Sequence, residues 1–195
     1  MTRTLRADGE INRLRILAVA RSAFAEHGIA VPVRDIARRA DVAPATIYRH
    51  FPGRADLVHA VLSDHVADCE TEMRRALEDS DPGRALRTTI QRFAQRQINE
   101  RGLNDALFGP AGAAGPFTAQ RRAHARLFEQ LVDRARATGS LRPQVSVEDI
   151  RAGLVAIASI SNLPTDKAKT VIARLVDLII AGIEPRQEGL LPTNE

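Results

Sequence analysis

Apolar residues recur every three or four positions along almost the whole sequence, and no stretch alternates apolar and polar residues for long. Such a spacing is the period of a helix with one buried face, whereas a half-buried strand needs a spacing of two. The pattern therefore predicts an all-α protein of about nine helices. With 195 residues, 44% of them hydrophobic, the chain is long enough to bury a substantial core.

Glycines and prolines divide this pattern into helices. Gly28 stands where a left-handed residue ends a helix, and Pro32 and Pro44 suit the first turns of the next two. A fourth helix carries an apolar stripe that recurs every four residues from Leu57 to Leu77. The expected helices span about 11–27, 32–40, 43–51, 54–77, 85–99, part of 101–120, 117–138, 147–161 and 166–183. We expect a helix-turn-helix domain over residues 1–55 and a second helical domain over residues 56–195.

The excess positive charge lies at one end of the chain. Residues 1–54 hold ten arginines and five acidic residues, whereas the remaining 141 residues hold 18 basic and 19 acidic residues. A localised basic field attracts polyanions, although a solvated charged face explains many such runs. Charge alone thus leaves nucleic-acid binding open.

Other features bear on the compartment and on excluded classes. The single cysteine, Cys69, rules out an intramolecular disulfide and fits a reducing cytoplasm. The longest uncharged stretch, residues 152–165, is too short to span a bilayer, and the start of the chain lacks a signal-peptide pattern. The 26 arginines against 2 lysines hint at a GC-rich bacterial genome. We expect a cytoplasmic bacterial protein with no membrane partner.

The segment "DVAPATIYRHFPGRADL", residues 41–57, concentrates hydrogen-bond donors. Two short helices joined by a tight turn within a three-helix cluster form the helix-turn-helix pattern, whose second helix enters the major groove of double-stranded DNA. Ile47 and Phe51, four positions apart, take the inner face of that helix. The predicted DNA-binding residues at its start and outer face, with one at the next helix start, are Ala43, Pro44, Thr46, Tyr48, Arg49, His50 and Arg54.

The stretch "ILAVARSAFAEHGIAVPVRDIARRADVAPATIYRHFPGRADLV", residues 16–58, resembles the DNA-binding domain of the TetR family of bacterial repressors. The resemblance implies an all-helical homodimer that binds a palindromic operator and is released by a small molecule. It also implies base or sugar-phosphate contacts at Pro44 and Thr46, phosphate contacts at Tyr48, His50 and Arg54, and an additional backbone contact at Arg34.

Three departures from the family pattern involve four positions. Val31 and Pro32 replace threonines that commonly cap the second helix, and Ala43 replaces a serine that commonly caps the third. Asp41 replaces the usual turn glycine, and aspartate tolerates the left-handed region better than most residues. These departures put contacts at Val31 and Ala43 in question but leave the expected fold intact.

The last two expected helices are apolar over more than half of their circumference. From the pattern alone, they are equally well read as central core helices or as an oligomer interface. The family resemblance favours a four-helix dimer interface between two copies. The residues assigned to it are Ile150, Leu154, Ile157, Val171, Leu175, Leu178 and Ile179.

By the same resemblance, an effector would bind between the fourth helix and the helices that follow it. The candidate lining residues are Val61, His65, Cys69, Phe93, Leu103, Leu107, Phe108, His124 and Phe128. Each could equally be a plain core residue. A wall so poor in polar groups favours an apolar or amphipathic effector. His65 and Cys69, four positions apart, could pair on a metal, but no third ligand is evident, so we expect neither metal nor cofactor.

Two alternatives remain open from the sequence. The chain could be a sequence-tolerant architectural DNA-binding protein, which would bind random and palindromic DNA with similar affinity. It could also be a small helical enzyme that uses the cavity of its second domain. No glycine-rich phosphate loop, HExxH or GxSxG motif supports an enzyme. We therefore expect a regulator and not a catalyst.

Overall fold

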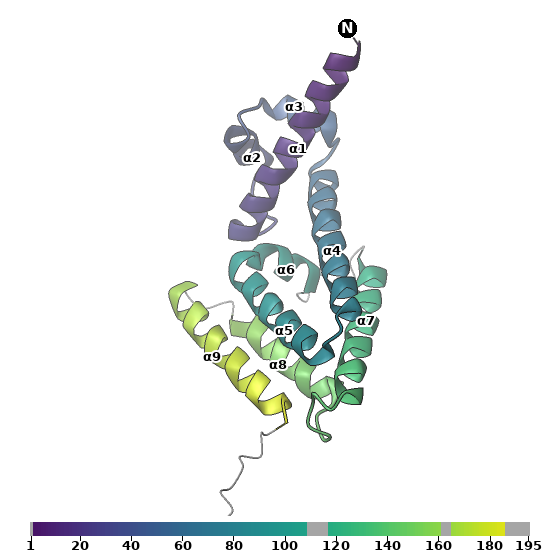
Figure 1. The fold of residues 1–195 in the computed structure, drawn as a ribbon. Coiled ribbons are helices and arrows are strands. Elements are labelled where there is room, and N and C mark those ends of the chain that lie inside the picture. Colours follow the sequence, from purple (N-terminus) through teal and green to yellow (C-terminus); the bar gives the residue numbers. More distant parts are fainter. Residues whose placement is uncertain (1, 109–116, 161–164, 186–195) are drawn as a thin grey trace, which may run out of the picture. The chain divides into compact units, whose positions relative to one another are not determined.

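The computed structural model describes residues 2–108, 117–160 and 165–185, and all of its regular elements are helices (Figure 1). In the described part of the chain there are nine, which confirms the predicted all-α class. They are α1 Thr2–His27, α2 Val33–Arg39, α3 Pro44–His50, α4 Arg54–Glu78, α5 Pro82–Asn99, α6 Arg101–Phe108, α7 Thr118–Ala137, α8 Val147–Ile160 and α9 Thr165–Ile183.

The chain divides into two compact units. The first contains Met1–Glu72 and Arg96–His124, and the second contains Met73–Gln95 and Ala125–Glu195. Helices α4, α5 and α7 therefore each contribute residues to both units. The functional division at residue 55, expected from the sequence, stays a prediction.

Helices α1, α2 and α3 form a cluster around one apolar core in the first unit. Its fully buried members include Ile16, Phe24 and Ile36. The N–H of Gly28 makes the last helical hydrogen bond of α1, to the carbonyl of Phe24 at 2.9 Å, and its φ of 77° then turns the chain out of the helix. Asp41 has a φ of 52° in the turn between α2 and α3. Both left-handed positions were predicted, and together they set the turns that orient α3.

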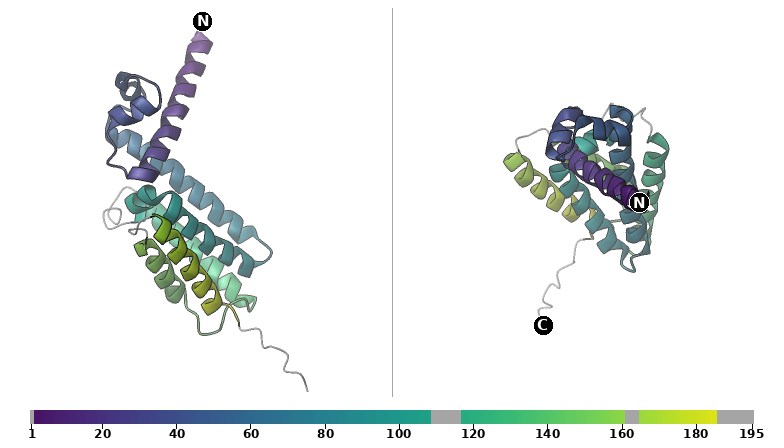
Figure 2. Two further views of the ribbon diagram at one scale, coloured as in Figure 1. Left: turned by 90° about the vertical axis from the view of Figure 1, so that its left-hand side faces the viewer. Right: turned by 90° about the horizontal axis from the view of Figure 1, so that it is seen from above.

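The first helix begins earlier than the sequence pattern predicted. We expected it to start near Ile11, where the apolar period becomes regular, whereas α1 starts at Thr2. Ile11 and Leu14 are 62% and 57% exposed, so the first turns of α1 do not pack into the core. Figure 2 shows these turns reaching beyond α2 and α3. Helical backbone thus extends beyond the segment that the core requires.

In the second unit, α8 and α9 lie side by side at close range. A Cβ added to Gly153 would stand 2.8 Å from the Cδ1 atom of Ile179, so the glycine permits this approach.

Ser146 and Asp149 cap the start of α8 reciprocally: the Asp149 N–H donates to Ser146 Oγ at 3.1 Å, and the Ser146 N–H donates to Asp149 Oδ2 at 2.8 Å. This reciprocal cap satisfies two backbone N–H groups at the start of α8.

Candidate nucleic-acid interface

Helix α3 separates its side chains into a buried face and an exposed face. Ile47 is 1% exposed and Phe51, directly after the helix, is 4% exposed, so both anchor α3 to α1 and α2 as predicted. Tyr48 is 47% exposed, and Arg49 is exposed beside it. Consecutive helix positions diverge by about 100°, so a buried residue at 47 directs 48 and 49 outward.

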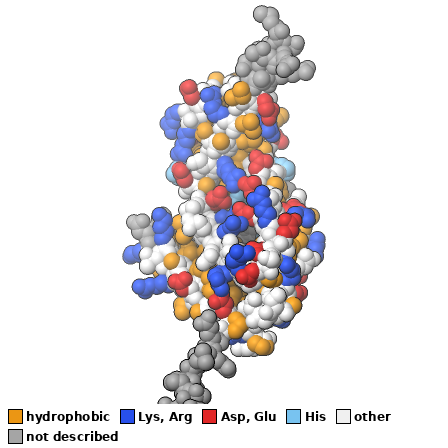
Figure 3. All heavy atoms as spheres, in the orientation of Figure 1, with side chains coloured by type: hydrophobic (Ala, Val, Ile, Leu, Met, Phe, Trp, Pro, Cys, Tyr) orange, Lys and Arg blue, Asp and Glu red, His pale blue; other side chains and the backbone are white. Residues whose placement is uncertain are grey.

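The outer face carries positive charge that no described residue neutralises. Arg34 on α2 and Arg49 on α3 are exposed and make no hydrogen bond or ion pair within the described parts of the chain. Figure 3 shows basic, acidic and apolar side chains interspersed on the visible surface of this cluster. An arginine presents five N–H donors in a rigid fork, which suits phosphate oxygens and base edges.

The predicted residues at the start of α3 are small and accessible. Ala43 and Pro44 are exposed, and Thr46 is half-buried. Ala43 occupies the N-cap position with extended backbone and no side-chain cap, and Pro32 does the same for α2. The two departures noted in the sequence thus leave both helices without side-chain capping. The small side chains of Ala43 and Pro44 leave the backbone at the start of α3 accessible to a ligand.

Of the predicted phosphate contacts, Arg54 has a hydrogen-bond partner inside the chain and His50 is half-buried. A guanidinium N–H of Arg54 donates to the carbonyl oxygen of Ile29, which ties the start of α4 to the turn after α1. His50 is half-buried, its ring lies 6.4 Å from the ring of Phe51, and its Nε2 is buried without a partner among the described residues. Arg34, Tyr48 and Arg49 are therefore the most available side chains of the predicted set.

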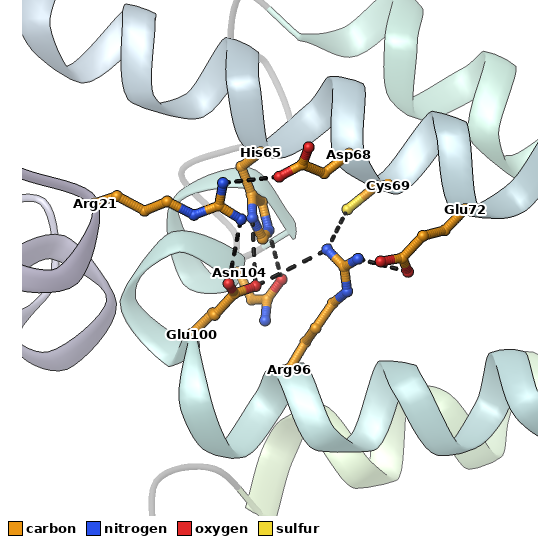
Figure 4. A network of polar contacts seen from close by, with 8 residues as sticks. All are labelled: Arg21, His65, Asp68, Cys69, Glu72, Arg96, Glu100 and Asn104. Carbon is orange, nitrogen blue, oxygen red and sulfur yellow. Dashed lines mark hydrogen bonds and ion pairs between the residues drawn. The ribbon is translucent and has the colours of Figure 1, made fainter. Parts of the chain in front are cut away.

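A network of polar side chains joins α1, α4, α5 and α6 within the first unit (Figure 4). Arg21 of α1 donates to Asp68 of α4 at 2.7 Å and to Glu100, between α5 and α6, at 3.3 Å. Arg96 of α5 pairs with Glu72 at 2.6 Å and donates to Cys69 Sγ at 2.9 Å. The network connects the first helix of the α1–α3 cluster to three helices that follow it.

His65 is fully buried at the centre of this network. Its Nδ1 lies 3.4 Å from Glu100 Oε2, and its Nε2 lies 3.4 Å from Asn104 Oδ1. Burial lowers the pKa of His65 from its ordinary value of 6.5, and the carboxylate of Glu100 opposes that shift. Burial likewise lowers the pKa of His124. Both rings are therefore favoured in their neutral forms at neutral pH.

The predicted effector residues are divided between the two units. Val61, His65 and Leu103 are buried in the first unit, where Cys69 and His124 are half-buried. Phe93, half-buried, and Phe128, buried, belong to the second unit. The side chains of Leu107 and Phe108 lie outside the described residues. His65 and Cys69 contact ionic partners, so this part of the predicted wall is more polar than the sequence suggested.

Sequence reasoning did not find Arg21, Glu100 and Asn104. Arg21 and its partner Glu100 are 79 positions apart in the sequence. Asn104 and its partner His65 are 39 positions apart. A charged residue on a helix is ordinarily a surface residue, and a single sequence carries no signal for such distant pairing. Gln97 and Asn104 are each only 3% exposed, and the spacing of apolar residues does not predict the burial of these two polar side chains.

The predicted dimer residues fall into two groups. Ile150 and Ile157 are fully buried within one chain, which removes them from any surface that a second copy could contact. Leu154, Leu175 and Ile179 are half-buried, and Val171 and Leu178 are 40% and 70% exposed. Val155, which was not predicted, is 65% exposed on α8. The apolar period identified both faces of these helices without distinguishing the core from the surface.

Two further findings concern other classes of site. None of the helices in the described ranges is long and apolar enough to cross a membrane. Nor do three or more histidine, cysteine, aspartate or glutamate side chains gather into a possible metal site among the residues whose side chains are described.

Family models match both parts of the chain. Residues 16–61 match the model described as bacterial regulatory proteins, tetR family, and residues 81–185 match the C-terminal domain model of SbtR-like transcriptional regulators. The second match covers more than half of the chain.

Solved structures are similar over nearly their whole length. A TetR transcription regulatory protein from Mycobacterium vanbaalenii is 34% identical, with 93% of this chain and 99% of that chain covered and a TM-score of 0.65. A TetR transcriptional regulator from Streptomyces coelicolor is 32% identical, with 89% and 99% covered and a TM-score of 0.67. These likenesses extend across both units.

Curated relatives match over a shorter stretch. An HTH-type transcriptional regulator of Mycobacterium tuberculosis is 35% identical over 83 residues, which are 42% of this chain and 42% of the relative. The HTH-type transcriptional regulator TtgR of Pseudomonas putida is 34% identical over 82 residues, or 42% of this chain and 39% of the relative. The chain thus matches about two fifths of the length of each.

Proposed function

Because the chain belongs to the TetR family of bacterial transcriptional regulators, we propose that it is a dimeric repressor that binds a palindromic DNA operator through α3. The observation that carries this proposal is the pair of exposed arginines, Arg34 and Arg49, beside the exposed Tyr48 on a helix fixed by Ile47 and Phe51. An anchored helix with free donors is what the readout of a DNA groove needs.

Within that interface, each predicted residue has a distinct task. Pro44 and Thr46 approach bases or the adjoining sugars, and Tyr48 and Arg34 bind phosphates. Arg49 contributes charge on the same exposed face. Phosphate contacts fix the position of the protein on the duplex, whereas base contacts carry its sequence preference. His50 and Arg54 act chiefly by holding the cluster together, because both have buried or intramolecular environments.

The exposed apolar side chains of α8 and α9 supply the dimer interface in this proposal. Val155, Val171 and Leu178 would be covered by their copies in a second chain. A two-fold interface is self-complementary, so the same patch serves both partners. It also places two recognition helices on one face of the duplex, about 34–36 Å apart, and requires an operator with matching two-fold symmetry.

Release from DNA is assigned to a small-molecule effector bound by the helices after α3. An amphipathic compound fits residues that combine apolar side chains, such as Val61 and Leu103, with the polar group of His65. The effector needs only to bind the DNA-incompetent arrangement better, and a coupling of about 1–3 kcal/mol changes operator affinity roughly 5–150-fold. The protein binds this compound without converting it and acts in the cytoplasm.

The proposal is tested by selecting bound duplexes from a random DNA pool at about 0.15 M salt. We expect a palindromic sequence bound roughly 10³-fold or more tightly than random DNA. Equal affinity for random and selected duplexes would favour a sequence-tolerant architectural protein and overturn the repressor proposal.

Two variants then test the residue assignments. Arg49→Ala should reduce the slope of log affinity against log salt by about 0.9 unit, because it removes one cationic group that can neutralise a phosphate. Tyr48→Phe should weaken binding at every salt concentration without changing the slope, because the lost hydroxyl is uncharged. Arg126→Ala removes an exposed arginine from α7 and serves as the matched control. A slope for Arg49→Ala and an affinity for Tyr48→Phe that both equal those of the control would show that this face of α3 does not bind the phosphate backbone.

A further inference from the structure

The first turns of α1 extend beyond the core of the DNA-binding cluster. Helix α1 starts at Thr2, whereas Ile16 is its first residue with a buried side chain among those described. The described side chains from Gly9 to Arg15 are all exposed or half-buried. We call residues 2–15 the N-terminal arm. Figure 2 shows the arm continuing past α2 and α3 without another helix of the cluster beside its outer end.

The base of the arm adjoins the end of the recognition helix. The guanidinium carbon of Arg13 lies 5.5 Å from the centroid of the Phe51 ring, and Phe51 directly follows α3. This contact fixes where the arm leaves the cluster. At about 1.5 Å per residue, residues 2–13 extend roughly 18 Å, which is about five base-pair steps of 3.4 Å along a duplex.

The composition of the arm suits a polyanionic partner. It holds Arg3, Arg6, Arg13 and Arg15 against Asp8 and Glu10, so its net charge is positive. Exposed Ile11 and Leu14 add apolar surface of the kind that can contact deoxyribose. A short helix without tertiary packing is marginal in water, so contact with a partner would stabilise the arm in its helical form.

We propose that the N-terminal arm is a second DNA-contacting element, which binds the phosphates flanking the bases read by α3. This inference rests on the proposed function, because it takes DNA as the ligand of the α3 face. Charge complementarity and continuity with that face favour DNA over other partners. Each protomer would then contact its half-site twice: α3 carries the sequence preference, and the arm adds affinity that depends on salt but not on sequence.

The test measures binding to a random-sequence 30-base-pair duplex between 50 and 200 mM salt. The arm variant is Arg3→Ala/Arg6→Ala, and the matched control is Arg122→Ala/Arg126→Ala, which removes two exposed arginines from α7. We expect the arm variant to lower the salt slope by about two units per bound protomer, at roughly 0.9 unit per phosphate contact. The control should leave the slope unchanged. A slope equal to that of the control would overturn the proposal.

Random DNA separates this inference from the proposed function, because its binding needs no operator. If no palindrome is selected but the arm variant lowers the slope, the proposal that the arm contacts DNA is supported and the repressor proposal is overturned. If Arg49→Ala lowers the slope and the arm variant does not, DNA binding through α3 is supported and the proposal that the arm contacts DNA is overturned.

A second variant tests for another occupant of the arm. Ile11→Asp/Leu14→Asp should weaken binding to the same duplex several-fold and leave the mass of the protein in solution unchanged. A change in oligomeric state with DNA affinity intact would assign the arm to contacts between copies of this chain, and would overturn the DNA proposal.

Discussion

The α1–α3 cluster and the α8–α9 pair use their apolar residues in opposite ways. In the cluster, Ile36 and Ile47 are buried, and the exposed face of α3 presents Tyr48 and Arg49. In the α8–α9 pair, apolar residues lie on both faces: Ile157 is fully buried, whereas Leu178 is 70% exposed. The first region offers a solvent-facing surface of hydrogen-bond donors, and the second offers one of hydrocarbon.

This difference indicates what each surface can bind. Arginine and tyrosine donors are well hydrated when free and exchange water for phosphate oxygens, so they suit a partner that comes and goes with salt and effector. Exposed leucine and valine side chains gain free energy only when water is excluded, at about 25 cal/mol per Å² buried. They suit a permanent partner of complementary shape, such as a second copy.

The largest expected effect separates core from surface directly. Ile36→Ala should lower the free energy of unfolding by about 2–5 kcal/mol, since the lost methylene groups leave a cavity. Leu178→Ala should change the stability of the dissociated monomer by about 0.5 kcal/mol or less. Urea unfolding at low protein concentration measures both values. A loss at Leu178 as large as that at Ile36 would show that its side chain is part of the core.

The second effect concerns the exposed apolar face as an interface. Leu178→Asp would bury two carboxylates, one from each copy, and should raise the dimer dissociation constant about 100-fold or more. Ala173→Asp places the same charge on another exposed face of α9 and is the control. Sedimentation velocity over a dilution series gives both constants. Equal, small effects of the two substitutions would place the dimer contact elsewhere.

The third effect is a pH dependence of stability in the first unit. Because burial lowers the pKa of His65 below 6.5 in the folded protein, the unfolded chain binds the proton more readily. Stability is therefore full above pH 6.5 and falls as the pH drops below it, by at most about 1.4 kcal/mol per pH unit for each such group. His124 contributes in the same direction.

Chemical unfolding between pH 7.5 and 5 measures this slope. His65→Gln should flatten it while keeping hydrogen-bonding groups beside Glu100 and Asn104. His124→Gln tests the second ring separately. A slope that persists in the double variant would show that other groups, and not these buried imidazoles, take up the protons.

The smallest effect compares helix starts in the two regions. Helix α8 has the reciprocal Ser146–Asp149 cap, whereas Ala43 leaves α3 without one. Ser146→Ala should cost about 1 kcal/mol of stability, and Ala43→Ser should add up to about 1 kcal/mol. Thermal unfolding of both variants checks the pair. No loss at Ser146 would mean that water replaces the cap without cost.

Local features of the fold were predictable from the sequence because their causes are local. Gly28, Pro44 and Asp41 set turns by their own backbone preferences, and each lies in the predicted conformation. The burial of Ile47 and Phe51 follows from their spacing alone. The start of α1 was missed because residues 2–10 carry no core period, although their backbone is helical.

The candidate sites were predictable only in part, because they depend on which face meets which neighbour. The spacing of Ile150 and Leu178 marks both as apolar helix positions, yet one is fully buried and the other 70% exposed. His65 lies on the apolar stripe of α4, but its partner Glu100 lies between α5 and α6. Such pairings are set by tertiary packing, which a single sequence does not record.

The environment of Cys69 has a practical consequence for biophysical work. Burial raises the pKa of its thiol, although the adjacent Arg96 guanidinium opposes the shift, and it is the only cysteine of the chain. A thiol that stays protonated reacts slowly with maleimides and methanethiosulfonates. A spin label could therefore be attached selectively at the exposed Ala18→Cys on α1, which belongs to the same cluster as α3 and is not among the residues assigned to DNA contact, with the native cysteine left in place. In the proposed dimer, pulsed electron resonance on that labelled protein would measure the distance between the two α1–α3 clusters, with and without DNA.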